Sequence, residues 1–254
     1  MVRRVLLLVS AASLALTGCV STRQVADVEF EPPQGDYSLV VMCPDVSVGS
    51  VTAGGLVEPR AEWTEQARAN LLAALRDQQA GRGGRTLIAE TRASLPGVDP
   101  QLVADLERLH NAVGNSIALH KYLGAELPTK RRGIDWTLGQ DAVKLGRATG
   151  MDYALFLYAQ DAIASSGRVA LQVLGLAGCF VGFCVPQGGG GQAAYASLVD
   201  LKTGDVVWFN VLQTGSQLPG VTMGDIRTPE GAAQMVERLL GRMRAGRNVR
   251  NRAG

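Results

Sequence analysis

Apolar residues along the chain follow two periods, which separate helices from strands. Spacings of three and four residues predict helices over residues 58–79, 99–122, 137–149 and 229–244. Short runs rich in β-branched and aromatic residues predict strands over residues 37–51, 85–90, 151–160, 167–175, 192–201 and 206–211. The first of these strands is expected to contain a turn at Pro44-Asp45. The order of these elements predicts an α/β (α+β) fold, in which helices pack on a mixed, mostly antiparallel sheet.

Three local signals support these boundaries. Gly150 is expected to end the helix over 137–149, because glycine adopts the left-handed conformation that ends many helices. Thr228 precedes Pro229 and is the expected N-cap of the last helix. The turn Lys202-Thr203-Gly204-Asp205 joins two apolar strands and predicts a hairpin.

The N-terminus has the pattern of a secretory signal. Arg3 and Arg4 precede an apolar run over residues 5–15, which is too short to span a bilayer as a helix. The stretch Leu16-Thr17-Gly18-Cys19 resembles the lipobox of bacterial lipoproteins. In that family the leader is cut before the cysteine, and the thiol and the new amino group carry acyl chains such as palmitate. A plain secretory signal and an N-terminal transmembrane anchor are the alternatives.

The lipobox resemblance also implies a location. In lipoproteins of Gram-negative bacteria, Asp after the cysteine commonly signals retention in the inner membrane, and here Val20 stands at that position. We therefore expect an outer-membrane lipoprotein facing the periplasm. Its expected parts are a signal peptide (1–18), a lipidated tether (19–36), a single periplasmic α/β domain (37–245) and a basic disordered tail (246–254).

Charge excludes one class of partner. The chain has 25 basic and 23 acidic residues, and loss of Arg3 and Arg4 with the leader makes these numbers equal. The overall charge therefore gives no reason to expect nucleic-acid binding. The basic tail is expected to be solvated, with contact to anionic lipid or another acidic envelope surface as the alternative.

Three cysteines remain besides Cys19. Cys43 follows an apolar run and is expected to be buried in a strand. Cys179 and Cys184 lie close together in sequence, so either a local disulfide in the oxidising periplasm or two free thiols is expected. Neither the cysteines nor His110 and His120 have the spacing of a zinc site, and no metal or other cofactor is predicted.

The segment 169–186 is almost entirely apolar. It is interpreted first as a buried strand with a connector, second as an apolar flap on the membrane or a partner, and third as a membrane-inserted element. The glycine run at 188–191 lacks the Lys and Ser/Thr of a phosphate-binding loop.

No catalytic constellation is evident in the sequence. Asp152, Asp161 and Asp200 lie near expected strand ends, and a hydrolase would require such carboxylates to converge on a cleft. The pair at 165–166 lacks the Gly-x-Ser-x-Gly elbow of serine hydrolases. We therefore do not expect an enzyme.

Two motifs carry a further resemblance. Gly150-Met151-Asp152-Tyr153 before an apolar strand, and the Asp200 to Trp208 hairpin, are similar to envelope lipoproteins with the TolB amino-terminal fold. The curli-secretion lipoprotein and the penicillin-binding-protein activator lipoproteins share that fold. The mature chain also resembles proteobacterial outer-membrane lipoproteins of unknown function, with residues 54–64 and 135–139 as signatures.

Those families act by binding partners, so the resemblance implies a lipid-anchored, non-catalytic protein-binding or assembly module. Its expected partners are the membrane, through the N-terminal lipid, and an unidentified envelope protein, while its oligomeric state is left open. The expected contact residues are Phe180, Phe183, Trp208 and Phe209. An oligomeric secretion or pore subunit and a periplasmic hydrolase are the alternative functions.

Overall fold

The computed structural model describes residues 20–25, 37–80, 84–125, 127–130, 134–180, 190–215, 224–241 and 243. Three predicted site residues, Cys19, Phe183 and Cys184, lie outside these ranges. Cys179 and Phe180 end a described helix, but their side chains are not described. The predictions of a lipid at Cys19 and of a disulfide between Cys179 and Cys184 therefore stay predictions.

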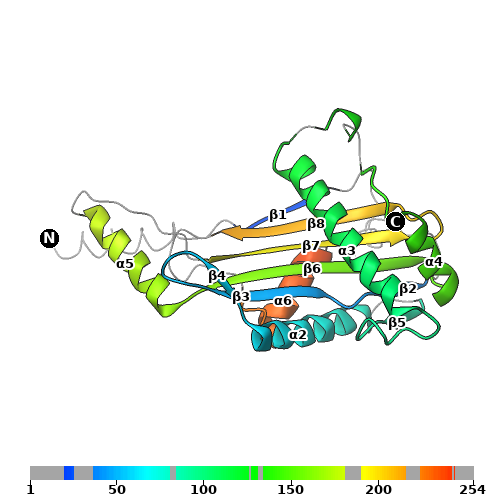
Figure 1. Cartoon of the computed structure of the whole chain (residues 1–254), viewed down its shortest axis with the longest axis horizontal. Coiled ribbons are helices and arrows are strands. Elements are labelled where there is room, and N and C mark those ends of the chain that lie inside the picture. Colours follow the sequence, from blue (N-terminus) through cyan, green and yellow to red (C-terminus); the bar gives the residue numbers. More distant parts are fainter. Residues whose placement is uncertain are drawn as a thin grey trace, which may run out of the picture.

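The described strands form one mixed sheet of eight strands (Figure 1). The hydrogen-bonded order is β1-β8-β7-β6-β2-β5, while β3 pairs with β4 and β6. β2 pairs in parallel with β5 and β6, and β3 pairs in parallel with β6; the other four pairings are antiparallel. The strands are β1 (Val20–Val25), β2 (Leu39–Val41), β3 (Asp45–Val51), β4 (Val57–Pro59), β5 (Thr86–Ile88), β6 (Tyr153–Ala164), β7 (Gly190–Asp200) and β8 (Val206–Gly215).

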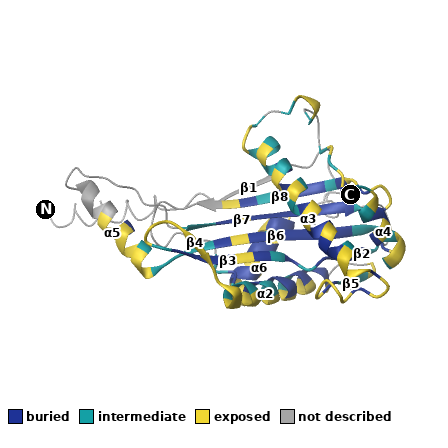
Figure 2. Cartoon of the chain, viewed as in Figure 1, coloured by how far each residue is buried: buried dark blue, intermediate teal, exposed yellow. Residues whose placement is uncertain are grey.

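Helices pack on the sheet, as the fold class predicts, and they cover both of its faces. Helices α2 (Ala61–Ala80) and α6 (Pro229–Leu240) pack on one face, and α3 (Pro100–Ile117) and α4 (Gly139–Thr149) on the other. Successive strand residues point to opposite faces. On β6, Leu155 and Leu157 therefore join the core under α2 and α6, while Phe156 joins the core under α3 and α4. Both cores are buried in Figure 2.

Several predicted helix boundaries are confirmed. Gly150 is left-handed at the end of α4, with φ of 65°. The hydroxyl of Thr228 accepts a hydrogen bond from the amide of Gly231 at 3.1 Å and caps α6. Asp99 caps α3 in the same way by accepting from the amide of Gln101. A π-helical turn, η1 (Ala118–Tyr122), extends α3, and a short 3₁₀ turn, η2 (Pro128–Lys130), follows.

The strand predicted over 37–51 is divided by a bulge. Val41 pairs with Leu155 and Asp45 pairs with Tyr158, so four steps on this strand match three steps on β6. The extra residue lies within 42–44, where Pro44 lacks the N–H that a regular ladder would use. This bulge separates β2 from β3.

The β7–β8 hairpin forms as predicted. Asp200 accepts a hydrogen bond from the amide of Lys202 at 2.7 Å, and Gly204 adopts a φ of 85° that favours glycine. The turn also contacts the start of α4, because the amide of Leu138 donates a hydrogen bond to the carbonyl of Gly204 at 2.7 Å. The hairpin therefore fixes the start of α4 against the sheet.

Three segments differ from their predictions. Residues 58 and 59, predicted to start a helix, belong to strand β4, and α2 begins at Ala61. Residues 167–175, predicted as a strand, belong to α5 (Ser166–Phe180). The first interpretation of 169–186, a buried core strand, is therefore wrong for its described part. An apolar run fits either element, and here the Ser165 hydroxyl accepts from the amide of Arg168 at 3.3 Å and starts a helix. Residues 20–25, expected to be tether, instead form edge strand β1.

Candidate functional site

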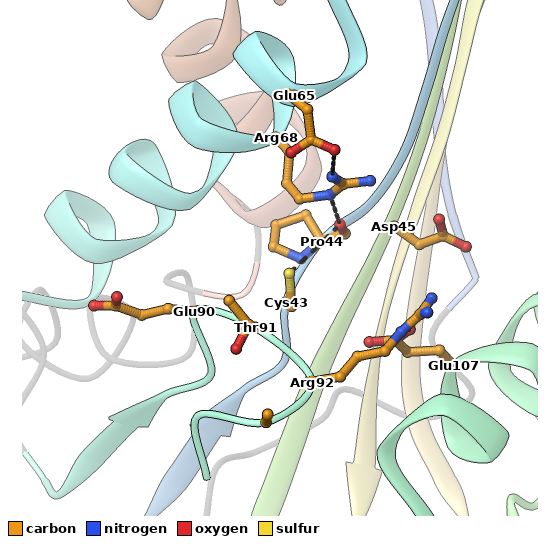
Figure 3. A pocket seen from close by; sticks show the side chains of 10 residues that line it. Cys43, Pro44, Asp45, Glu65, Arg68, Glu90, Thr91, Arg92 and Glu107 are labelled. Carbon is orange, nitrogen blue, oxygen red and sulfur yellow. Dashed lines mark hydrogen bonds and ion pairs between the residues drawn. The ribbon is translucent and has the colours of Figure 1, made fainter. Parts of the chain in front are cut away.

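A pocket of about 430 Å³ opens where β2 and β5 end. These two strands are adjacent and parallel, so their carboxyl ends meet at one edge, which is where open α/β sheets commonly bind ligands. Helices α2 and α3 contribute the other walls. The lining residues, most of them labelled in Figure 3, are Cys43, Pro44, Asp45, Glu65, Arg68, Glu90, Thr91, Arg92, Ala93 and Glu107.

The pocket lining is charged and cross-linked by ion pairs. Arg68 donates to Glu65 at 2.5 Å and to the Pro44 carbonyl at 3.3 Å, which ties α2 to the bulge (Figure 3). Arg92 donates to Glu107 at 2.6 Å and ties the loop after β5 to α3. Four carboxylates and two guanidinium groups line the pocket, and Arg76 pairs with Glu90 from outside the lining, so the formal charge of the group is slightly negative.

Glu107 is the buried member of this group. Its side chain is 7% exposed, whereas that of Arg92 is 58% exposed. Burial raises the pKa of Glu107 above its usual range, and the hydrogen bond from Arg92 opposes that rise. The ion pair with Arg92 therefore stabilises the ionised form of Glu107, whose burial without a cation would cost free energy.

Asp45 connects the pocket to the core on the α3 side. The Asn111 amide on α3 donates to the Asp45 carboxylate, and the hydroxyl of Tyr195 on β7 donates to the Asn111 carbonyl at 3.2 Å. Tyr195, a buried residue of β7, thus positions Asn111, and Asn111 in turn positions Asp45 in the pocket wall. This support fixes the position of Asp45 without filling the pocket.

Cys43 is half-buried in the pocket wall, not fully buried as expected. It is a free thiol, and burial raises its pKa above the ordinary value. Since the thiolate is the nucleophilic form, a raised pKa makes the thiol less reactive. The environment of Cys43 therefore does not activate it.

The three aspartates considered for a hydrolase do not converge. Asp200 pairs with Tyr153 next to Asp152, but Asp161 lies eight residues further along β6. At about 3.3 Å per residue, this separation is about 26 Å. Asp152 has a structural partner, because it accepts hydrogen bonds from the Ser38 amide and hydroxyl at 3.0 and 2.8 Å.

Asp161 is buried near Asp225 and Arg227, in the segment that precedes α6. It accepts a hydrogen bond from Gln192 at 2.8 Å. Desolvation raises its pKa to about 6, and the nearby Asp225 adds to this rise. The group is therefore ionised at neutral pH only at a cost in stability.

Two of the predicted contact residues are in the core. Trp208 is 1% exposed and Phe209 is 0% exposed. Trp208 packs toward α2 and α6, and Phe209 packs toward α3 and α4. The prediction that their side chains contact a partner is wrong, because alternation along β8 places both adjacent residues under helices.

The two histidines have local roles. His110 is buried, stacks on Phe156 and is kept neutral because burial lowers its pKa to about 3. His120 Nδ1 lies 2.6 Å from the Ala125 carbonyl oxygen. Among the described residues, no group of three or more His, Cys, Asp or Glu side chains could hold a metal ion.

The signature stretches at 54–64 and 135–139 also serve the fold. The Thr64 hydroxyl accepts from the amide of Val48 at 3.0 Å and so joins α2 to β3. Thr137 donates to the Gly204 carbonyl at 2.9 Å and joins the start of α4 to the hairpin. These motifs reflect contacts between elements and give no direct sign of chemistry.

A second surface is apolar and lies at one end of the sheet. Helix α5 extends beyond the ends of the strands and away from the other helices (Figure 1). Six of the nine exposed large hydrophobic side chains in the described residues lie on α5 or beside its start. They are Leu56, Val57, Val169, Leu171, Val173 and Leu174, and we call them the apolar end. No helix in the described ranges has both the length and the apolar character needed to cross a membrane.

The chain is similar in structure to three bacterial proteins. No protein-family model and no curated protein sequence matches it significantly. A PelC dodecamer from Paraburkholderia phytofirmans, carrying one substitution, has a TM-score of 0.40 and 14% identity over 89% of this chain and 99% of its own.

The second is lipoprotein GNA1162 from Neisseria meningitidis, with a TM-score of 0.30 and 12% identity over 82% of this chain and 97% of its own. The third is protein XCC0632 from Xanthomonas campestris, with a TM-score of 0.33 and 10% identity over 90% of this chain and 96% of its own. Likenesses at these scores do not assign an activity.

Proposed function

We propose that the chain is a lipid-anchored envelope protein that acts as a non-catalytic binding or assembly module. The charged pocket between α2 and α3 is its recognition site, and its ligand is a basic segment of a partner protein. The observation that carries this proposal is the pocket lining, in which four carboxylates and two guanidinium groups surround about 430 Å³. That volume is within the range of ligand pockets and large enough for side chains of a partner.

The charge pattern favours a basic partner. Glu65 and Glu90 are more than half exposed, at 71% and 63%, and each is ion-paired at the rim, with Arg68 and Arg76 respectively. An incoming cation would therefore exchange with an arginine at these carboxylates. The buried Glu107 is already paired with Arg92 and shapes the wall. Rim charges of one sign speed encounter with a partner of the opposite sign and disfavour partners of the same sign.

The same lining supports binding without catalysis. Cys43 is the nucleophile in the wall, and burial raises its pKa. Both arginines are engaged with carboxylates, and Asp45 is held by Asn111. This arrangement presents a preformed charged surface, in which Glu107 is ion-paired with Arg92 and burial makes the Cys43 thiol a weaker nucleophile.

The lipid anchor rests on the lipobox stretch that ends at Cys19. Each buried methylene adds about 0.8 kcal/mol to membrane attachment, so several acyl chains hold a protein firmly. The anchor predicts that the wild-type chain is in the outer-membrane fraction and that Cys19→Ser is released or unprocessed.

The test is co-purification from detergent-extracted membranes, followed by sizing. We expect a partner to elute with the wild-type chain and to be lost from the double variant Glu65→Gln, Glu90→Gln. Asp141→Asn is the matched control, because Asp141 also forms an exposed helical i,i+3 pair, with Lys144, but lies outside the pocket. The partner should also be released as salt is raised, because exposed charges are screened.

Retention of the partner by the double variant would overturn the pocket as the recognition site. A large ring of this chain alone would favour the secretion or pore subunit instead. Hydrolysis of an envelope substrate, unaffected by the two substitutions, would favour the hydrolase.

A further inference from the structure

The sheet register places the predicted lipid anchor beside the apolar end. Val20, the residue after Cys19, pairs with Thr214 on β8. Thr214 pairs with Gln192 on β7, and Gln192 pairs with Asp161 on β6. Val20 is thus three strand spacings from Asp161, about 14 Å across the sheet.

Helix α5 starts at this same end of the sheet. It begins at Ser166, two residues after β6 ends at Ala164. The amide of Ser165 donates to the carbonyl of Val51 at 3.0 Å, and Arg168 donates to the carbonyl of Ala53 at 3.1 Å. The β3–β4 turn with its exposed Leu56 is therefore fixed against the start of the helix.

The exposed side chains of α5 are spread around the helix. Val169, Leu171, Val173 and Leu174 are exposed, whereas Gln172 is buried. With about 3.6 residues per turn, the four apolar side chains cover an arc of about 200°. A helix docked on another protein typically shows an apolar stripe of about 100°. Exposure over twice that arc fits an apolar medium better than a single protein face.

We propose that the apolar end is a membrane-docking surface, with α5 lying in the interface of the bilayer that holds the lipid anchor. This inference rests on the lipid anchor of the proposed function. Two attachments at one end of the sheet orient the domain. Asp45 pairs with Tyr158, six residues before the end of β6, so the pocket is held about 20 Å from that end, toward the aqueous side.

The experiment uses the full lipidated chain in vesicles of phosphatidylethanolamine and phosphatidylglycerol, with and without brominated acyl chains. Leu174→Trp reports on α5, and Leu123→Trp is the matched control. The two leucines are 66% and 67% exposed. Leu123 lies far from the apolar end, because its neighbour Tyr122 contacts Phe209 on β8. In the sheet register Phe209 is level with Phe156 on β6, eight residues before the end of that strand, which is about 26 Å.

We expect brominated lipid to quench the added fluorescence of Leu174→Trp at least about twofold, because interfacial helices bury their apolar side chains about 5–10 Å deep. The added fluorescence of Leu123→Trp should stay unchanged. The native Trp63, Trp136 and Trp208 are common to both variants, so the unsubstituted chain gives the background.

Vesicle flotation separates the two ways to fail. If the wild-type chain floats, Cys19→Ser does not, and Leu174→Trp is unquenched, the docking surface is overturned while the anchor stands. Equal quenching of both variants, or a blue shift of Leu174→Trp without quenching, as contact with a second copy would give, also overturns it. If the wild-type chain does not float, the anchor fails and the docking surface fails with it.

Discussion

Arg92 Nε lies 2.6 Å from Glu107 Oε2, and this ion pair joins the loop after β5 to helix α3 across the pocket. The two partners differ in exposure, since Glu107 is buried and Arg92 is mostly solvated. The pair therefore neutralises a buried carboxylate from the solvent side. Its removal tests whether the pocket wall depends on this neutralisation.

Arg92→Ala should lower the free energy of unfolding by about 1–2 kcal/mol at about pH 7, because it leaves a buried carboxylate without its cation. Loss of Arg92 should raise the pKa of Glu107 further, since Arg92 lowers it now. The destabilisation should therefore shrink as the pH falls and Glu107 takes up a proton. Urea unfolding at about pH 7 and about pH 4 measures both effects.

The control for this prediction is Glu107→Gln, alone and combined with Arg92→Ala. If the ion pair carries the effect, Arg92→Ala should cost much less in the Glu107→Gln background. An equal cost in both backgrounds would show that packing of the Arg92 side chain, and not its charge, matters.

Asp161→Asn should stabilise the protein above about pH 6. The folded pKa of Asp161 is about 6 against an ordinary 3.8, so between these values the folded state holds a proton that the unfolded state has lost. The free energy of unfolding of the wild type therefore falls as pH rises through this window and is level above it. Since one pKa unit corresponds to about 1.4 kcal/mol, the gain in the variant is at most about 3 kcal/mol.

Thermal unfolding of both chains from about pH 4 to about pH 8 checks this result. The difference in stability between Asp161→Asn and the wild type should develop between about pH 4 and pH 6. Asp225→Asn should not become more stable than the wild type over this range, because Arg227 lowers the pKa of Asp225. A difference that does not change with pH would refute a charge effect at Asp161.

Gly146→Ala should destabilise the protein by about 1–3 kcal/mol, although alanine normally favours a helix. A Cβ at this position would lie 2.7 Å from the Leu201 carbonyl oxygen, so α4 would have to move away from the hairpin. Gly241→Ala is the control, because a Cβ there meets nothing within 4 Å and its φ is −58°. Chemical unfolding of both variants should show a loss for the first and none for the second.

The sequence was sufficient to predict most of the fold because its periods are clear. The stripe over 137–149 and the cap at Thr228 match α4 and the start of α6. The strand prediction for residues 167–175 was wrong because a continuous apolar run has no polar positions that would reveal a helical or a strand period. Ser165 was the signal that could have identified a helix there, because its hydroxyl accepts a hydrogen bond from the amide of Arg168 as an N-cap residue does.

The pocket was harder to predict, because its residues come from four separate parts of the chain. Glu65 and Arg68 belong to α2 and Glu107 to α3, while residues 43–45 join β2 to the start of β3 and residues 90–93 follow β5. No local motif links them. The parallel pairing of β2 with β5 brings two of these parts together, and the packing of α2 and α3 on the sheet adds the other two. The turn expected at Pro44-Asp45 was the one local sign, since proline within a strand indicates a bulge, and the bulge lies there.

The most direct test of the central claim is a photo-crosslinking amino acid placed at Ala93 in the anchored, full-length chain. Ala93 is an exposed residue of the pocket lining, and Ala148 on α4 is an exposed alanine outside it. In intact envelopes, the account predicts one discrete adduct from position 93, its loss in the Glu65→Gln, Glu90→Gln background, and no such adduct from position 148. The absence of an adduct from position 93, or the same adduct from both positions, would contradict the pocket as the recognition site.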